Sequence, residues 1–181
     1  MRVGLIVDSA CDLPYEFSRK HDLFVLPVTA VIDGQTYIDK HDPVRTQEFY
    51  QSGLLQKGHQ AETRAFTAEQ IHDLFMEKIV TQFDVAICET VTKTRSLIFQ
   101  NATEAMNSVL ANYEGARHAA GRDGRFFMRV IDSKQIFAGQ GLLAAHTLKL
   151  IDQNVSKNAL RHEVETFSDR IYTCVIPRDL H

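Results

Sequence analysis

The segment 3–14, VGLIVDSACDLP, constrains the fold of this chain more than any other stretch. Residues 3–7 form a continuous apolar run, which is typical of a strand buried on both faces of a sheet. The run ends in Asp8 and Ser9, and turn residues follow. In an open α/β sheet, small polar groups at the carboxyl end of a strand lie where such sheets bind ligands. Asp8 and Ser9 are therefore the first candidate site residues, although Ser9 fits equally well as the cap of a helix beginning near Pro14.

Apolar runs recur along the chain and alternate with segments of helical pattern. The runs predict strands at residues 3–7, 24–31, 85–88, 126–131 and 172–176. Helices are predicted at residues 46–55, 68–80, 96–113, 139–152 and 157–170. This alternation predicts an α/β fold with a mainly parallel sheet covered by helices on both faces. Asp33-Gly34 predicts a local hairpin within residues 30–41, because this dipeptide suits a turn of positive φ.

Composition and cysteine usage restrict the classes of function. The formal charge of -3 over 181 residues comes without a dense Lys/Arg run, which disfavours binding to nucleic acid. No apolar window approaches the length of a membrane span. The three cysteines are far apart, and the eight histidines include no H-E-x-x-H pattern, so the sequence suggests neither a disulfide framework nor a metal site. We therefore expect a cytoplasmic protein without a metal.

Hydroxyl and carboxyl groups follow each predicted core strand. They comprise Asp8 and Ser9, then Thr90, Thr92, Thr94 and Ser96, then Asp132 and Ser133, with a fourth group at residues 63–67. The carboxyl ends of parallel strands share one edge of a sheet, so these groups are expected to converge on an anion site. Each group also fits a helix cap, and residues 67–70 form a capping box.

Neither G-x-x-x-x-G-K-[ST] nor G-x-G-x-x-G is present, so no cofactor is predicted. Gly139 and Gly141 are interpreted as sites of close helix contact.

These residues together resemble the DegV family of bacterial fatty-acid-binding proteins. The resemblance is carried by residues 7–14, by Val25-Leu26-Pro27-Val28, and by Val130-Ile131-Asp132-Ser133 with the Gly-x-Gly beyond it. It implies a doubly wound α/β domain followed by a smaller second domain, with a long-chain fatty acid held between them. The family's chains usually continue past the length of this one. We therefore expect an α/β domain at residues 1–168 and the beginning of the second domain, incomplete in this chain, at residues 169–181.

The family's carboxylate contacts map onto Thr63 and Ser96. Two departures from the family pattern place Arg64 and Arg95 beside these hydroxyls, where the family has a Thr-Ser-Gln-Pro-Ser segment and a Ser-Gly-Thr segment. A guanidinium forms charge-assisted bonds to a carboxylate or a phosphate, so one arginine is expected to face the ligand. The secondary candidate contacts are Asp8, Ser9, Arg64, Thr94, Arg95, Asp132 and Ser133.

The resemblance implies a protein that is not an enzyme. It would bind a long-chain fatty acid, with the carboxylate on Ser/Thr hydroxyls and the tail in an apolar tunnel, for presentation to a separate fatty acid kinase. The sequence is compatible with an oligomer as well as with a monomer. The alternative is an enzyme that acts on a small anionic or phosphorylated substrate with Asp8, Ser9 and Asp132. That alternative lacks an activated nucleophile or a metal constellation in the sequence.

Overall fold

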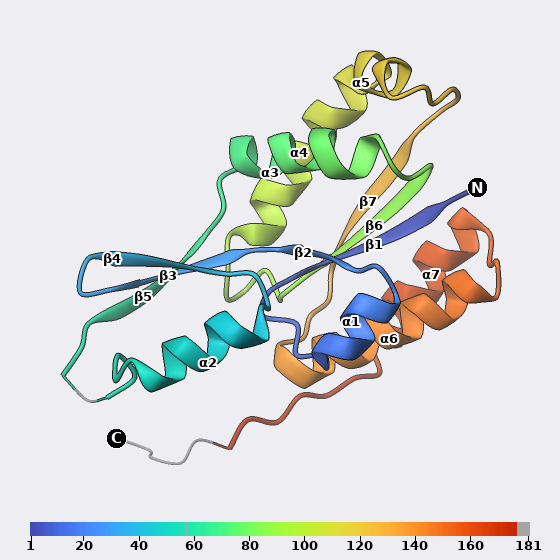
Figure 1. The fold of residues 1–181 in the computed structure, drawn as a ribbon. Helices are drawn as coiled ribbons and strands as arrows, with labels where there is room; N and C mark the ends of the chain where they lie inside the picture. Colours follow the sequence, from blue (N-terminus) through green and yellow to red (C-terminus); the bar gives the residue numbers. More distant parts are fainter. Residues whose placement is uncertain (57, 177–181) are drawn as a thin grey trace.

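The main sheet is parallel and has four strands in the order β2-β1-β6-β7 (Figure 1). The computed structural model describes residues 1–56 and 58–176. The four strands are β1 (Val3–Asp8), β2 (Phe24–Leu26), β6 (Val85–Thr90) and β7 (Phe127–Asp132). Neighbouring strands pair in parallel, with Val7 opposite Glu89 and Thr90 opposite Asp132. The predicted α/β class and mainly parallel sheet are confirmed.

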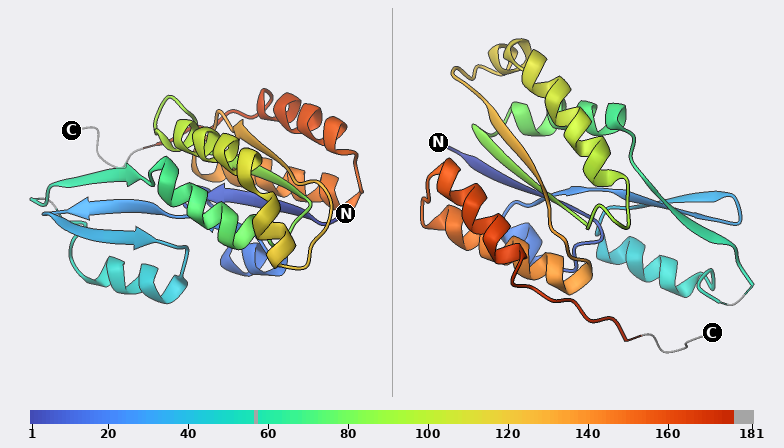
Figure 2. Two further views of the ribbon diagram at one scale, coloured as in Figure 1. Left: turned by 90° about the horizontal axis from the view of Figure 1, so that it is seen from above. Right: turned by 180° about the vertical axis from the view of Figure 1, so that it is seen from behind.

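Helices cover both faces of this sheet (Figure 2). One face packs against α3 (Ala68–Leu74), its π-helical continuation η1 (Phe75–Val80) and α4 (Ile98–Asn112), with α5 (Glu114–Ala119) following α4. The other face packs against α1 (Tyr15–Lys20), α6 (Phe137–Asp152) and α7 (Lys157–Ser168). The side chains of β1 alternate between the two apolar layers, Ile6 in the first and Val7 in the second. This alternation explains why the strand reads as a continuous apolar run.

A smaller antiparallel sheet extends from the main one in the order β4-β3-β5. Its strands are β3 (Val28–Ile32), β4 (Gln35–Asp39) and β5 (Ala61–Ala65), and α2 (Pro43–Gln51) lies beside it (Figure 1). The predicted hairpin is confirmed, since Ile32 pairs with Gln35 across Asp33 (φ 49°) and Gly34 (φ 80°). The strand predicted at residues 24–31 is instead two strands separated by Pro27, which lacks the N–H that a continuous ladder needs.

Two further predicted segments also differ in the structure. The helix predicted at residues 46–55 spans Pro43–Gln51, because the Asp42 side chain accepts from the Arg45 N–H and Pro43 suits the first helical turn. The strand predicted at residues 172–176 is wrong, since that segment is extended but makes no ladder with another strand of the described residues. Residues 177–181, the last part of the segment expected to begin a second domain, lie outside the described residues. No helix within residues 1–56 and 58–176 is both long and apolar enough to cross a membrane.

Candidate binding site at the carboxyl end of the main sheet

Asp8, the last residue of β1, holds the segment that follows β6. Its carboxylate accepts from the Ala10 N–H (3.0 Å) and from the Val91 N–H (2.5 Å), and its side chain is fully buried. Burial raises the pKa of Asp8, while these two backbone hydrogen bonds act in the opposite direction. Asp8 therefore fixes the start of residues 91–97 against β1.

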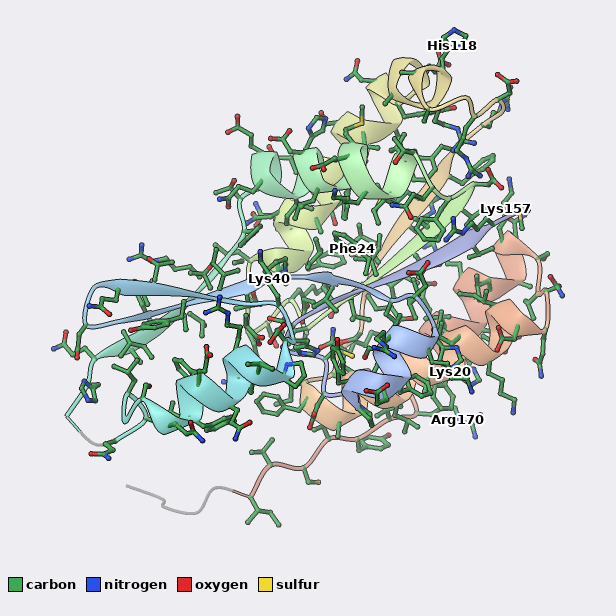
Figure 3. The ribbon with its side chains drawn as sticks, in the orientation of Figure 1. Lys20, Phe24, Lys40, His118, Lys157 and Arg170 are labelled. Atoms are coloured by element: carbon green, nitrogen blue, oxygen red, sulfur yellow. The ribbon has the colours of Figure 1, made fainter. Side chains whose placement is uncertain are left out.

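Ser9 links the two sheets. Its hydroxyl accepts from the Val28 N–H at the start of β3 (3.0 Å), and its carbonyl oxygen lies 2.6 Å from His41 Nε2. His41 follows β4 and adopts a positive φ of 56°. Lys40, just before it, is labelled in Figure 3 near the junction of the two sheets. His41 was not among the predicted site residues, because a lone histidine between a strand and a helix carries no pattern.

Asp132 and Ser133 organise the turn after β7. Asp132 Oδ1 accepts from the backbone N–H groups of Lys93 (3.2 Å) and Lys134 (3.0 Å), and Lys93 Nζ lies 4.0 Å from Asp132 Oδ2. Ser133 is fully buried, and its hydroxyl accepts from the Gln135 N–H at 3.1 Å. Asp8 and Asp132 thus hold turn N–H groups, which is the local role that aspartate favours.

Ser96 lies at one end of a surface groove of about 570 Å³ along α4. Its hydroxyl accepts from the N–H of Ile98 (3.2 Å), the first residue of that helix, while Leu97 occupies the N-cap position. Thr94 is exposed and contacts the Thr92 hydroxyl at 3.2 Å, and Arg95 is exposed outside the groove. The groove is lined by Lys93, Ser96, Leu97, Phe99, Gln100, Thr103, Glu104 and Asn107. Lys93, which the sequence did not single out, therefore lines the same groove as Ser96, with its Nζ 4.0 Å from Asp132 Oδ2.

Thr63 and Arg64 are exposed on β5, in the smaller sheet. The Arg64 guanidinium pairs with Glu62 on the same strand. The segment after β5 is joined to α4, because Asn101 Nδ2 donates to the Phe66 carbonyl oxygen at 2.7 Å. The chain segments that carry Thr63 and Ser96 are thus connected by a direct hydrogen bond at the first turn of α4.

Two buried polar side chains near this edge carried no sequence signal. Glu89 in β6 and Gln140 in α6 are both fully buried, yet glutamate inside an apolar strand and glutamine inside a Gly-x-Gly belong to no recognised motif. Among the described residues, no three His, Cys, Asp or Glu side chains gather as a metal ion would require.

An open parallel sheet with polar turns gathered at its carboxyl edge defines an α/β domain of the ligand-binding type. The chain belongs to the DegV family, whose model, described as one of uncharacterised proteins, matches residues 2–181. It is 41% identical to a DegV domain-containing protein of Xanthomonas axonopodis pv. citri over 181 residues, which is 100% of this chain and 58% of that relative. The chain therefore spans little more than half the length of this relative.

Solved structures show the same fold. A stearic acid-binding protein of Eubacterium ventriosum matches with a TM-score of 0.74 and 27% identity, over 90% of this chain and 52% of that one. A DegV lipid binding protein of Thermotoga maritima matches with a TM-score of 0.79 and 17% identity, over 94% of this chain and 55% of that one. The doubly wound fold expected from the resemblance is confirmed by these matches.

Proposed function

We propose that this chain is the α/β part of a protein that binds a long-chain fatty acid. The observation that carries the proposal is membership of the DegV family together with the 27% identity to a stearic acid-binding protein. In this proposal the hydroxyls of Thr63 and Ser96 hold the carboxylate, and apolar side chains sheath the tail. Burial of the tail contributes about 0.8 kcal/mol per CH₂ group, which gives a long acyl chain ample affinity.

The contacts around the two hydroxyls support this assignment. Ser96 opens onto a groove that also contains Lys93, and the segment after Thr63 is bonded to the first turn of α4. The enzymatic alternative loses support, because both oxygens of Asp8 and Oδ1 of Asp132 accept backbone N–H groups. A binding protein that is not an enzyme fits these contacts.

The proposal extends to the organisation of the protein. Residues 1–168 form the α/β domain, and residues 169–181 begin a second domain that closes over the ligand. A separate kinase receives the bound fatty acid, and the protein acts in the cytoplasm. The statements on the domains and the kinase rest on the family resemblance, and the statement on the cytoplasm rests on the composition and cysteine usage of the sequence.

Native mass spectrometry of the purified chain, followed by denaturing extraction, tests the proposal. We expect a co-purifying or added C16–C18 fatty acid to bind, and Ser96→Ala and Thr63→Ala each to weaken affinity by roughly tenfold or more, because hydrogen bonds to a charged group contribute about 1.5–3 kcal/mol. Ser108→Ala is the control, since Ser108 is exposed on the same helix but does not line the groove. A chain that binds no fatty acid, even at the length of its full-length relatives, would overturn the proposal.

A further inference from the structure

Glu89 places a carboxyl group in the apolar layer between the main sheet and α6. The side chain is fully buried and shares this layer with Ile87 and Leu143. The Thr147 hydroxyl donates to Glu89 Oε1, whereas Oε2 has no hydrogen-bond partner. A buried carboxylate oxygen without a donor is costly, so the ionised form of Glu89 is poorly accommodated here.

Gln140, in the first part of α6, also has a buried side-chain oxygen without a hydrogen-bond partner. Its Nε2 donates to the backbone carbonyl oxygen of Glu89 at 3.2 Å, which places the amide group directly beside this residue. Its Oε1 is buried and has no partner. An amide oxygen accepts only from a donor, and an ionised carboxylate has none to give. One proton on Glu89 Oε2 would satisfy both orphaned oxygens at once.

We propose that Glu89 is a protonated carboxylic acid at neutral pH and that its Oε2–H donates to Gln140 Oε1. This proton-dependent hydrogen bond fastens the start of α6 to the end of β6. With this proton in place, both carboxyl oxygens of Glu89 and the amide oxygen of Gln140 have hydrogen-bond partners, as buried polar networks require.

The titratable groups around Glu89 leave the proton on this residue. Burial raises the pKa of Glu89 to about 8, although the hydrogen bond from Thr147 acts in the opposite direction. Asp8, on neighbouring β1, accepts two backbone N–H groups, which act against the rise that burial causes in its pKa. Cys11 and Cys88 have pKa values raised by burial, so both thiols stay neutral where Glu89 titrates.

The bond also positions the candidate site, a consequence that rests on the proposed function. Gln140 Nε2 donates to the Glu89 carbonyl oxygen, and the Gln140 side chain also acts to lower the pKa of Asp8, whose carboxyl group holds the Val91 N–H. Val91 begins the segment that ends at Ser96. Glu89 is thus a positioning residue, which acts on Ser96 through Gln140 and Asp8 without touching a ligand.

Infrared difference spectroscopy on the ligand-free chain tests the protonation. Wild type minus Glu89→Gln is expected to show the carbonyl stretch of a protonated carboxylic acid at pH 6–7, and this band is expected to disappear with a midpoint near pH 8. Glu114→Gln, at an exposed position on α5, serves as the control and is expected to leave the band intact. A spectrum without the band at pH 6 overturns the proposal.

The pH profile of fatty-acid affinity tests the positioning role. If only the protonated form holds the site, wild-type affinity falls about tenfold from pH 7 to pH 9, which is one unit above the pKa of Glu89. The Glu89→Gln variant keeps the shape of the side chain and has a permanent N–H donor, so its affinity is expected to stay constant from pH 7 to pH 9. The control variant Glu114→Gln is expected to lose affinity over this range as wild type does. Identical profiles for wild type and Glu89→Gln overturn the positioning role. If neither chain binds a fatty acid, the proposed function fails, while the infrared band still decides the protonation.

Discussion

Gly141 shows how a single missing side chain sets the position of a helix. A Cβ at this residue would lie 2.4 Å from the carbonyl oxygen of Asp12, so α6 approaches the turn after β1 too closely for any other residue. We expect Gly141→Ala to lower the free energy of unfolding by about 1–3 kcal/mol through overpacking. Gly115→Ala on α5, where a Cβ meets nothing within 4 Å, is expected to be neutral or stabilising. Urea unfolding measures both, and a Gly141→Ala chain as stable as wild type contradicts the close approach.

Lys93 illustrates that a sequence alone does not predict which cationic side chain lines a groove. Arg64 and Arg95 were predicted from their positions in the motifs that the family resemblance maps, but the direction of a long side chain depends on tertiary packing. In the structure Arg64 pairs with Glu62, and Lys93 rather than Arg95 lines the groove.

We expect Lys93→Gln to weaken binding of a fatty acid by roughly fivefold, since a partly exposed ion pair contributes up to about 1 kcal/mol. Binding of the alcohol of the same chain length should change little, because it carries no charge. The double variant Arg64→Ala, Arg95→Ala tests the arginine prediction in the same titration. A larger loss in the double variant than in Lys93→Gln would favour the arginines as the contacts to the carboxylate.

At the scale of elements, buried strands were predictable, and an exposed strand was predictable only where a turn sequence preceded it, as in β4. The strands β1 and β6 are apolar because helices cover both of their faces, whereas the edge strand β7 exposes Phe127 and Arg129 and still has an apolar majority. The Asp33-Gly34 turn has its own chemical signature. Strand β5, with the sequence AETRA, is largely exposed, so its register is set by pairing with β3 and no hydrophobic pattern announces it. For the apolar segment 172–176 the error was the reverse. Its composition predicted a strand, but no neighbouring strand pairs with it among the described residues.

Arg117 is the residue through which α5 is attached to the amino-terminal edge of the sheet. Its buried guanidinium donates to the carbonyl oxygens of Val80 (3.0 Å) and Phe83 (2.6 Å), and to the carboxylate of Asp84 (3.0 Å). Lysine has neither the planar fork nor five donors, so Arg117→Lys is expected to destabilise the chain by about 2–4 kcal/mol. Arg161→Lys, in an exposed pair with Glu165 on α7, is expected to change stability by less than about 1 kcal/mol. Equal effects of the two substitutions in urea unfolding would show that α5 is not held by Arg117.

For the whole molecule, two carboxyl groups at opposite ends of the sheet shape the dependence of stability on pH. Asp84 accepts from the Arg2 N–H (2.7 Å) and from the guanidinium groups of Arg122 and Arg117, and these bonds hold the pKa of its carboxyl well below the usual range. Glu89 has the opposite shift. The folded chain therefore binds fewer protons than the unfolded chain at Asp84, and more at Glu89.

The two shifts act on different parts of the pH range. The stabilisation from Asp84 is fully present above its unfolded pKa of 3.8 and is lost as the pH falls below it. Between pH 4.5 and 8 the folded chain keeps the Glu89 proton that the unfolded chain releases, so stability falls with rising pH, by at most about 1.4 kcal/mol per pH unit, and levels off above 8.

Urea unfolding between pH 3 and pH 9 separates the two contributions. Glu89→Gln is expected to flatten the decline between pH 5 and 8, because an amide has no proton to lose, and to leave the acid limb unchanged. Asp84→Asn is expected to lower stability at pH 7 and to flatten the acid limb, whereas Asp22→Asn, at an exposed partner of Arg2, keeps that limb. If Glu89→Gln parallels wild type across the whole range, Glu89 has the same pKa in the folded and unfolded chains, and the polar contact between α6 and β6 does not depend on a proton.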